Sequence, residues 1–386
     1  TIGTEAFKAT GNTAFVLPNS ITTLSNSLFN SCEKLTEVTI GNEVTSIGSS
    51  VFANCKKLTT LIAPVPEQDE DTPARQTVTG IVFPASLSSI GNSAFMNCES
   101  VKTVYVPETV TKLGTNVFQG SGITEAELPN SITAGSNAMF QSCASLRKVT
   151  LGNSMTSIGQ NMFRDCTALE TISVKGAEET PETPAFNLPP TLTSIGTWAF
   201  ANCKKMTSIV IPDGVTSIGA NDFDGCSALA SVTLPARLST IGNYAFRNTA
   251  ITELTLPATT GDMAYTSDIL YGCPEGTKVY VCNTGTPKRA GSNLWRLATG
   301  KYAQIAVPAG KKSDYTAAAG WKSSAISEVM PDGIECEYTV GDNGSDDVEI
   351  RVEAGFTYET ELPAMFREAN DFCLFTDQAE FNVLYR

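Results

Sequence analysis

Cysteine is the residue type in this chain whose number and spacing could do chemistry, because eleven cysteines occur in 386 residues. Thiolates in such numbers can bind metal ions or form disulfides. Eight cysteines share one position of a repeating pattern: Cys32, Cys55, Cys98, Cys143, Cys166, Cys203, Cys226 and Cys273. No C-x-x-C pair is present, so the spacing does not indicate a compact four-cysteine metal site. One fixed position per unit instead predicts an interior column of packed, unbridged thiols, whose side chains point the same way.

Three further cysteines, Cys282, Cys336 and Cys373, lie outside this pattern. Two interpretations of the last pair stay open: a Cys336–Cys373 disulfide in an exported protein, or two more buried thiols. Cysteine usage therefore does not decide the redox compartment.

The rest of the composition gives no sign of catalysis. Histidine is absent, which excludes Ser-His-Asp and Cys-His sites and every zinc site that contains histidine. Phosphate-binding and dinucleotide-binding glycine motifs are also absent from the sequence. A glycosidase needs only two carboxylates, but the acidic residues fall at expected surface positions. The acidic run Asp342–Asp347 could offer oxygen ligands to calcium, yet it lacks the EF-hand spacing and is typical of turns. We predict no enzyme activity, no cofactor and no metal site.

The net charge of −14 is concentrated at one end, since residues 331–386 contain 14 acidic and 3 basic side chains. Without a basic stripe, nucleic acid is a poor partner. The acidic end is either a solvated surface or a module that docks a partner or a cation. The sequence has no apolar run long enough to span a membrane and no secretory signal. Because it opens part-way into a repeat, we expect a missing upstream segment with a signal or a lipid anchor.

A phenylalanine, replaced by leucine at its last occurrence, marks the unit to which the cysteines belong. It recurs at intervals of 22 to 24 residues, apart from two gaps of 43 and 37 residues that contain insertions. The positions are Phe7, Phe29, Phe52, Phe95, Phe118, Phe140, Phe163, Phe200, Phe223, Phe246 and Leu270. Such a period is typical of a solenoid, in which each unit needs neighbours to bury its apolar face.

Each unit ends in a stretch that alternates apolar and polar residues, as in Leu35–Ile40 and Leu169–Val174. A period of two with β-branched residues predicts a short strand, and the proline or Gly-Asn that follows predicts a turn. The segment around the phenylalanine has room for one or two helical turns. Stacked units of this kind predict a parallel sheet, with the phenylalanines and thiols inside the coil.

The unit Val44–Leu61 follows the pattern Val-x-x-Ile-Gly-x-x-x-Phe-x-x-Cys-x-x-Leu. This pattern resembles the BspA-like class of bacterial leucine-rich repeats, found mainly on surface proteins of anaerobes that live on host mucosa. The resemblance covers residues 1–274. It implies an α/β repeat solenoid, a right-handed superhelix with a parallel β-sheet. The units at Phe7, Phe118 and Phe246 depart from the pattern because they lack the cysteine and are one residue shorter in the segment after the phenylalanine, as in Phe118–Ile123.

Two insertions interrupt the solenoid at residues 64–83 and 175–189, and we expect both to project from one edge as proline-rich acidic loops. Over residues 275–330 we predict a capping region, in which Tyr315 and Trp321 cover the last open repeat. A ligand platform built from these two aromatics is the alternative. Residues 331–386 predict a small, acidic, strand-rich module.

The outward side chains of the strands form the predicted binding surface, because solenoids often bind partners through such a face. Tyr105 is its aromatic candidate, since interface hot spots favour Trp, Tyr and Arg, and Ile62 and Val210 are apolar neighbours. The charged candidates are Glu37, Glu125, Glu127 and Lys148. A plain solvated sheet and contacts through the two insertions are competing interpretations.

The resemblance implies a non-catalytic protein, secreted or on the cell surface, that adheres to protein or glycan ligands of the host or of bacteria. We expect a monomer, which could associate with a membrane only peripherally or through a lipid on the missing N-terminus. The contrasting hypothesis is a structural spacer or assembly component without a specific ligand.

Overall fold

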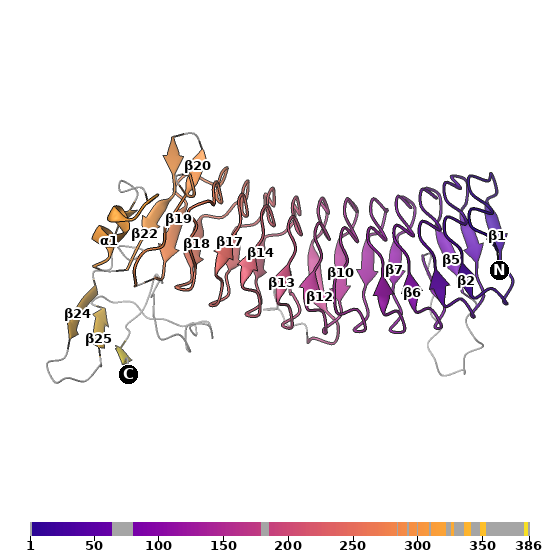
Figure 1. Ribbon diagram of the computed structural model, residues 1–386, viewed down its shortest axis with the longest axis horizontal. Helices are drawn as coiled ribbons and strands as arrows, with labels where there is room; N and C mark the ends of the chain where they lie inside the picture. The colour runs from indigo at the N-terminus through magenta and orange to yellow at the C-terminus, as the bar shows by residue number, and fades with distance from the viewer. Residues whose placement is uncertain are drawn as a thin grey trace.

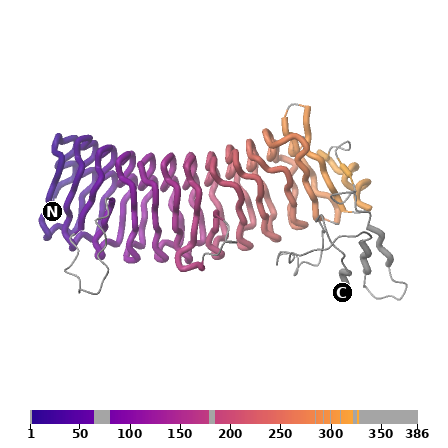
Figure 2. Tube along the Cα trace, turned by 180° about the vertical axis from the view of Figure 1, so that it is seen from behind, coloured from indigo at the N-terminus to yellow at the C-terminus, as the bar shows by residue number. Residues whose placement is uncertain are grey.

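The computed structural model describes residues 2–63, 80–178, 185–283, 285–291, 293–298, 300–308, 310–321 and 326–327, and the backbone of three strands beyond them. The described repeats form an elongated coil of stacked turns with the N-terminus at one end (Figure 1). Viewed from behind, successive turns follow one another in register along the coil (Figure 2). The predicted repeat solenoid with a parallel sheet is confirmed, and it contains little helix.

One strand of each turn builds a parallel sheet along one side of the coil. These strands are β1 (Ala14–Val16), β3 (Glu37–Thr39), β5 (Thr60–Ile62), β7 (Thr103–Tyr105), β9 (Glu125–Glu127), β10 (Lys148–Leu151), β12 (Thr171–Val174), β14 (Ser208–Val210), β16 (Ser231–Thr233) and β18 (Glu253–Leu256). The alternating residues put an apolar side chain such as Val38 or Val149 into the core and leave its neighbours outward. Neighbouring strands pair without a shift, so Val149 lies beside Ile172.

Two-residue strands form a second parallel ladder, and most of them end at the isoleucine of the Ile-Gly pair of their repeat. The ladder consists of β2 (Thr23–Leu24), β4 (Ser46–Ile47), β6 (Ser89–Ile90), β8 (Lys112–Leu113), β11 (Ser157–Ile158), β13 (Ser194–Ile195), β15 (Ser217–Ile218) and β17 (Thr240–Ile241). The glycine is needed because adjacent turns approach closely here. A Cβ on Gly91 would lie 2.6 Å from the carbonyl carbon of Gly48, and one on Gly159 would lie 2.5 Å from the Ser136 oxygen.

The segment around each phenylalanine differs from the expected helical turns. Residues two before and two after the phenylalanine have left-handed backbone, such as Ser50 (φ 55°) and Asn54 (φ 62°) around Phe52. A residue in the left-handed conformation interrupts a right-handed helix. Apart from glycine, asparagine and aspartate adopt this conformation most readily. The backbone groups of this segment therefore form hydrogen bonds to the neighbouring turn: the Phe52 N–H donates to the carbonyl of Ala94 in the next turn, at 2.8 Å.

The phenylalanines form one stacked column through the coil. From Phe7 to Phe246, successive ring centroids lie 5.1 to 5.8 Å apart and the planes differ by 5° to 23°. All of these rings except the terminal, partly buried Phe7 are fully buried. The column is the core that the repeat period predicts, and each ring is packed by its neighbours on both sides.

Each insertion returns to the coil as an additional rung of the sheet. The buried Ile81 forms parallel bridges with Leu61 and Val104, and the buried Phe186 forms one with Ile172. The expectation that the insertions are loops throughout is therefore wrong for residues 80–83 and 185–188. Their alternating apolar residues repeat the strand pattern and bury the same face. Residues 64–79 and 179–184 of the expected loops lie outside the described residues.

These extra rungs affect the shape of the coil. Strands in a sheet lie about 4.8 Å apart, which is less than the spacing of the phenylalanine rings, so equal numbers of rungs would bend the coil towards its sheet. The chain passes from Phe52 to Phe95 in one 5.1 Å step of the ring column while the sheet gains the rung of Ile81. The additional rungs lengthen the sheet side, and the coil follows a gentle curve in both views (Figures 1 and 2).

The parallel sheet continues into the predicted capping region. There β18 pairs with β19 (Lys278–Val281), which pairs with β22 (Gln304–Ala306) and then β23 (Ile326–Ser327). The antiparallel hairpin of β20 (Arg296–Ala298) and β21 (Lys301–Tyr302) stands above the coil in Figure 1, and the short helix α1 (Lys312–Ala317) follows β22. Further on, β24 (Cys336–Val340), β25 (Val348–Val352) and β26 (Asn382–Leu384) form an antiparallel sheet.

We propose that Tyr315 and Trp321 form the cap of the solenoid. Both side chains are buried, their rings meet edge to face at 4.9 Å, and Trp295 packs on Trp321 at 5.8 Å. The Tyr315 hydroxyl donates to the carbonyl of Asn283 (2.9 Å), and the Trp321 Nε1–H donates to that of Lys288 (2.8 Å). Aromatics that are buried with their polar atoms bonded internally are part of the core, not a ligand platform.

Candidate functional site

The eight repeat cysteines form the predicted interior column, and each is buried as a free thiol. The Sγ–H of one unit donates to the phenylalanine carbonyl of the preceding unit, as from Cys55 to Phe29 (3.0 Å) and from Cys166 to Phe140 (3.1 Å). In the three units without cysteine, a hydroxyl takes the place of the thiol and contacts the next cysteine: Thr10 with Cys32, Ser121 with Cys143, and Thr249 with Cys273. The column is thus a structural ladder.

Burial makes these thiols chemically inert. It raises the pKa of Cys143 to about 11, although hydrogen bonds from Ser121 oppose the shift. Burial also raises the pKa of Cys55, to about 12. The thiolate is the reactive form of cysteine. In the folded chain these thiols are shielded from reagents and remain protonated, so they should react slowly.

We expect thiol labelling to separate the folded from the unfolded chain. In reducing buffer without denaturant, the nine free cysteines of the described residues should not react with iodoacetamide, so at most Cys336 and Cys373 should be labelled. All eleven should react in guanidinium. Mass spectrometry counts the labels, and rapid native labelling of any repeat cysteine would contradict the buried column.

The structure brings four predicted surface residues together in the middle of the sheet. Tyr105 on β7, Glu125 and Glu127 on β9, and Lys148 on β10 occupy three adjacent strands. In the pairing register Tyr105 lies beside Glu127, and Lys148 lies beside Glu125. Lys148 is exposed and the other three side chains are partly exposed, so this part of the face is accessible to a partner.

The other three candidates lie apart from this group. Glu37 on β3 and Ile62 on β5 belong to the N-terminal part of the sheet, and Val210 lies on β14, in a separate pair of strands with β16. Ile62 is 36% exposed and Val210 46% exposed. Two apolar side chains at such separated points do not make one continuous patch.

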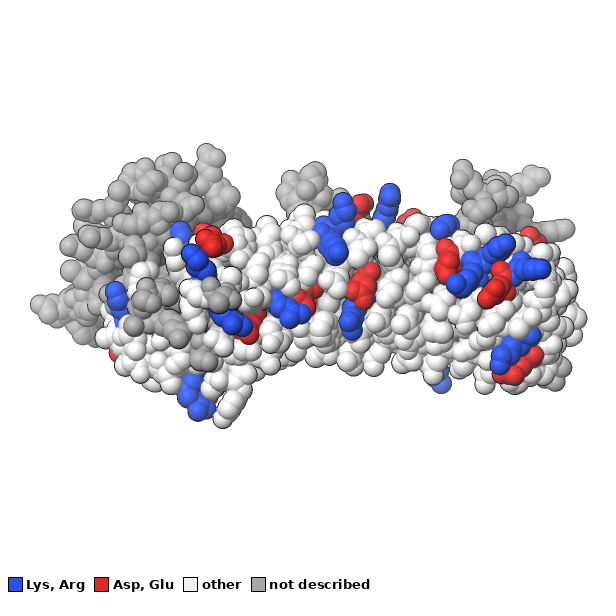
Figure 3. Space-filling view, turned by 90° about the horizontal axis from the view of Figure 1, so that it is seen from above, with Lys and Arg blue, Asp and Glu red and all other residues white. Residues whose placement is uncertain are grey.

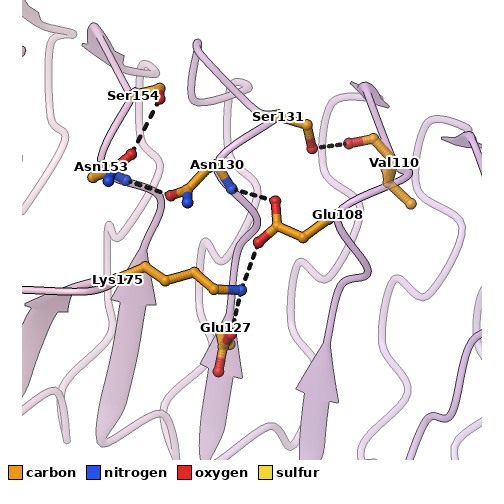
Figure 4. Close-up of polar contacts among 8 residues, drawn as sticks. All are labelled: Glu108, Val110, Glu127, Asn130, Ser131, Asn153, Ser154 and Lys175. Atoms are coloured by element: carbon orange, nitrogen blue, oxygen red, sulfur yellow. Dashed lines mark hydrogen bonds and ion pairs between the residues drawn. The ribbon is translucent and has the colours of Figure 1, made fainter.

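Lys175 and Glu108 are the surface residues that the sequence reasoning missed (Figure 4). The Lys175 ammonium lies 2.6 Å from a Glu108 oxygen and 2.7 Å from a Glu127 oxygen, which links the end of β12 to two earlier turns. The other Glu108 oxygen accepts the backbone N–H of Asn130 (3.0 Å), whose side chain accepts that of Asn153 (2.9 Å). The signal in the sequence was weak, because Lys175 and Glu108 are about three repeats apart along the chain.

The charges of this network favour structure over catalysis. Hydrogen bonding to Lys175 lowers the pKa of Glu108. Although partial burial opposes it, bonding to Glu108 and Glu127 raises the pKa of Lys175. A general acid needs a carboxyl group with a raised pKa, and a general base needs a carboxylate that is not already paired. Glu108 meets neither condition, because it is charged and paired with Lys175. The positive charge of Lys175 also compensates part of the negative charge of Glu127, so this part of the sheet is less acidic than its glutamates alone suggest.

Two predictions fall outside the described part of the chain: the acidic run Asp342–Asp347, and the Cys336–Cys373 pair, of which only the backbone of Cys336 in β24 is described. Within the described part, no cluster of three or more metal-ligating side chains occurs. No described helix is long and apolar enough to cross a bilayer.

The repeat units and their internal thiol ladder agree with a known family. The model of the BspA type leucine-rich repeat region matches six copies over residues 1–69, 74–186 and 178–275. The chain belongs to this family. Proteins of this repeat class in bacteria typically have a non-catalytic, protein-interaction role. No curated protein matches the chain in sequence.

Several solved structures share the leucine-rich repeat fold. A protein from Bacteroides ovatus is 19% identical over 76% of this chain, with a TM-score of 0.48, and the match spans 63% of that protein. The T. pallidum leucine-rich repeat protein is 23% identical, and the match covers 51% of this chain and 79% of that protein (TM-score 0.40). A leucine-rich cell surface protein from Faecalibacterium prausnitzii is 21% identical, covering 81% and 91% respectively (TM-score 0.40).

Proposed function

We propose that the protein is an exported, non-catalytic recognition protein that adheres to a macromolecule of the host or of other bacteria. Membership of the BspA-type family supports a place outside the cell, since this repeat class occurs mainly on surface proteins. The absence of histidine supports a binding role over a catalytic one.

The observation that carries the proposal is the group of accessible residues on β7, β9 and β10. Parallel pairing fixes Tyr105, Glu125, Glu127 and Lys148 relative to one another, and the Lys175 bridge holds Glu127 in place. A rigid group loses little conformational entropy on binding. It combines a tyrosine, which is favoured at hot spots, with charges of both signs that could orient a protein partner.

A structural spacer is the second candidate function, and the elongated shape of the coil favours it (Figure 1). An elongated coil of stacked turns is suited to holding a further domain away from a surface. A spacer requires no specific chemistry on the sheet.

Binding to an array of extracellular-matrix proteins tests the two candidates. We expect saturable binding of the whole chain to at least one protein, weakened about tenfold or more by Tyr105→Ala, in the range of a hot-spot truncation. Ser231→Ala, at an exposed position on the distant β16, is the matched control and should bind unchanged. Silence across the array, or equal binding by all variants, would reject the sheet-face site, and silence would favour the spacer.

A further inference from the structure

A second surface, away from the strands of the sheet, carries aromatic and charged side chains. We name it the aromatic ridge, and it comprises Trp198, Tyr244 and Tyr271 with Arg164, Arg247, Arg296, Asp165, Asp224 and Asp268. Apart from Arg296, these residues flank the column position of their repeat. In the repeats from Phe29 to Phe140, the positions two before and one after the phenylalanine hold uncharged residues instead: Ser27, Asn30, Ser50, Ala53, Ser93, Met96, Asn116, Gln119, Ala138 and Gln141. The ridge is therefore confined to the C-terminal half of the coil.

The backbone of the ridge is unfavourable for its large aromatic residues. Trp198 has a φ of 62° and Tyr244 a φ of 59°, at the position where Asn161 and Asn221 occupy the same left-handed region. Asparagine tolerates this conformation, whereas a bulky side chain there is a strained exception. Packing does not require the rings, since serine and asparagine suffice in other repeats. Strain kept where the fold does not need it is typical of a functional site.

Each aromatic ring of the ridge is held by an arginine. The guanidinium carbons of Arg164 and Arg247 lie 4.6 Å from the ring centres of Trp198 and Tyr244. Arg296, on β20, lies 5.0 Å from the ring of Tyr271. These cation–π contacts fix the partly exposed rings in one orientation. A surface that is ordered before binding loses less entropy when a ligand arrives.

Each of these arginines is also paired with an aspartate. Arg247 forms a two-pronged pair with Asp224, and Arg296 Nε donates to Asp268 at 2.7 Å. Arg164 lies 3.5 Å from Asp165, which also accepts from Asn202 at 2.7 Å. The three arginines and three aspartates balance in charge. On the face seen in Figure 3, basic and acidic side chains likewise lie mostly in adjacent pairs. A charged polymer would have to break these pairs, so the ridge suits an uncharged ligand.

The spacing of the ridge indicates an extended ligand. Trp198 and Tyr244 are at the same position two repeats apart, and the intervening steps of the phenylalanine column are 5.6 and 5.5 Å. Tyr271 follows in the next repeat, so the three rings run along the coil axis. The surface between them is polar and charged, unlike the apolar centre of a protein interface, from which charged residues are depleted.

We propose that the aromatic ridge binds a neutral oligosaccharide chain that lies along the coil axis. Sugar rings have apolar C–H faces that can pack on the aromatic rings of Trp198, Tyr244 and Tyr271. Tyrosine and tryptophan suit such contacts because each combines an apolar ring with a polar group. Sugar hydroxyls both donate and accept hydrogen bonds. Asp224 and Asp268 are buried and hold their arginines in place, whereas the guanidinium groups are partly exposed. An arginine paired in this way retains N–H groups that can donate to sugar hydroxyls without losing its own contact. This site is separate from the sheet face of the proposed function.

Calorimetry with neutral hexasaccharides tests the proposal on the whole chain. The probes are cellohexaose, laminarihexaose, mannohexaose and maltohexaose. We expect saturable binding of at least one, with a change in tryptophan fluorescence, because Trp198 is partly exposed while Trp295 and Trp321 are buried. Trp198→Asn and Tyr244→Asn should each weaken binding at least tenfold. Both should keep the fold, since asparagine occupies this position in other repeats, and unchanged thermal unfolding checks this.

Two controls distinguish this site from the sheet face and from charge attraction. Tyr105→Ala should bind the oligosaccharide unchanged, and Trp198→Tyr should retain binding because it keeps an aromatic ring. Failure of all four probes to bind would overturn the proposal, whatever the matrix-protein array shows. It would equally be overturned if the asparagine variants bound as well as the parent chain, or if only a sulfated polysaccharide bound, with affinity lost at high salt.

Discussion

Replacing Phe163 by alanine should lower the free energy of unfolding by about 3–5 kcal/mol. Its ring is fully buried and stacks between Phe140 at 5.8 Å and Phe200 at 5.5 Å. Truncation removes apolar burial and two ring contacts. It also leaves a cavity, because hydrogen bonds between the backbones of neighbouring turns keep these turns from moving together to fill the space. Urea unfolding of the whole chain, followed by circular dichroism, measures the loss.

Phe7→Ala is the matched control at the end of the same column. Phe7 is partly buried and has a column neighbour on one side only, so its truncation should cost clearly less. Since each repeat contacts only its neighbours, hydrogen exchange in Phe163→Ala should increase first in the adjoining turns. An equal cost for both variants would contradict a cooperative ring column.

The stability of the protein should fall as pH rises from about 4 to about 7 because of one buried carboxyl. Asp222 is fully buried, at a position that Ala199 and Ala245 occupy in the neighbouring repeats. Burial raises its pKa from the ordinary 3.8 to about 7, and a hydrogen bond from the Gly219 N–H (2.6 Å) opposes the shift only in part. The folded state therefore holds the proton more tightly than the unfolded state, and ionisation between these values costs roughly 4 kcal/mol.

Asp222→Ala should remove this pH dependence. At pH 8 the variant should be more stable than the parent chain, because no charge remains to be buried, whereas at pH 4 the two should be similar. The exposed Asp213→Ala serves as the control and should keep the slope of the parent chain. Thermal unfolding at a series of pH values provides the comparison. A parent chain whose stability rises steadily from pH 4 to 7, or an unchanged slope in Asp222→Ala, would contradict the assignment.

The repeat period allowed the central features of this fold to be predicted from the sequence. The recurring phenylalanines and the cysteines of eight units form two interior columns, and the alternating segment Leu35–Ile40 contains a strand of the parallel sheet. The burial of Tyr315 and Trp321 agrees with the proposed cap, since an open apolar end of a solenoid needs a cover.

Local features that depend on neighbouring turns were not predictable in this way. The left-handed residues around Phe52 replace the expected helical turns because backbone groups there bond to the next turn. The rungs at Ile81 and Phe186 lie in segments whose acidic, proline-rich composition favours loops. Of the predicted surface residues, the structure groups only those on β7, β9 and β10, and their partner Lys175 comes from a later repeat.

The sequence by itself determined which residues are inside and that similar turns stack, because a periodic pattern needs only its own repetition to specify burial. The tertiary structure alone decided which surface residues meet. Side chains such as Arg164 and Trp198, or Lys175 and Glu108, are separated by one or more repeats along the chain and become neighbours only when the turns are stacked in register. Contacts across turns depend on that register and on the direction of each side chain, neither of which the order of residues states.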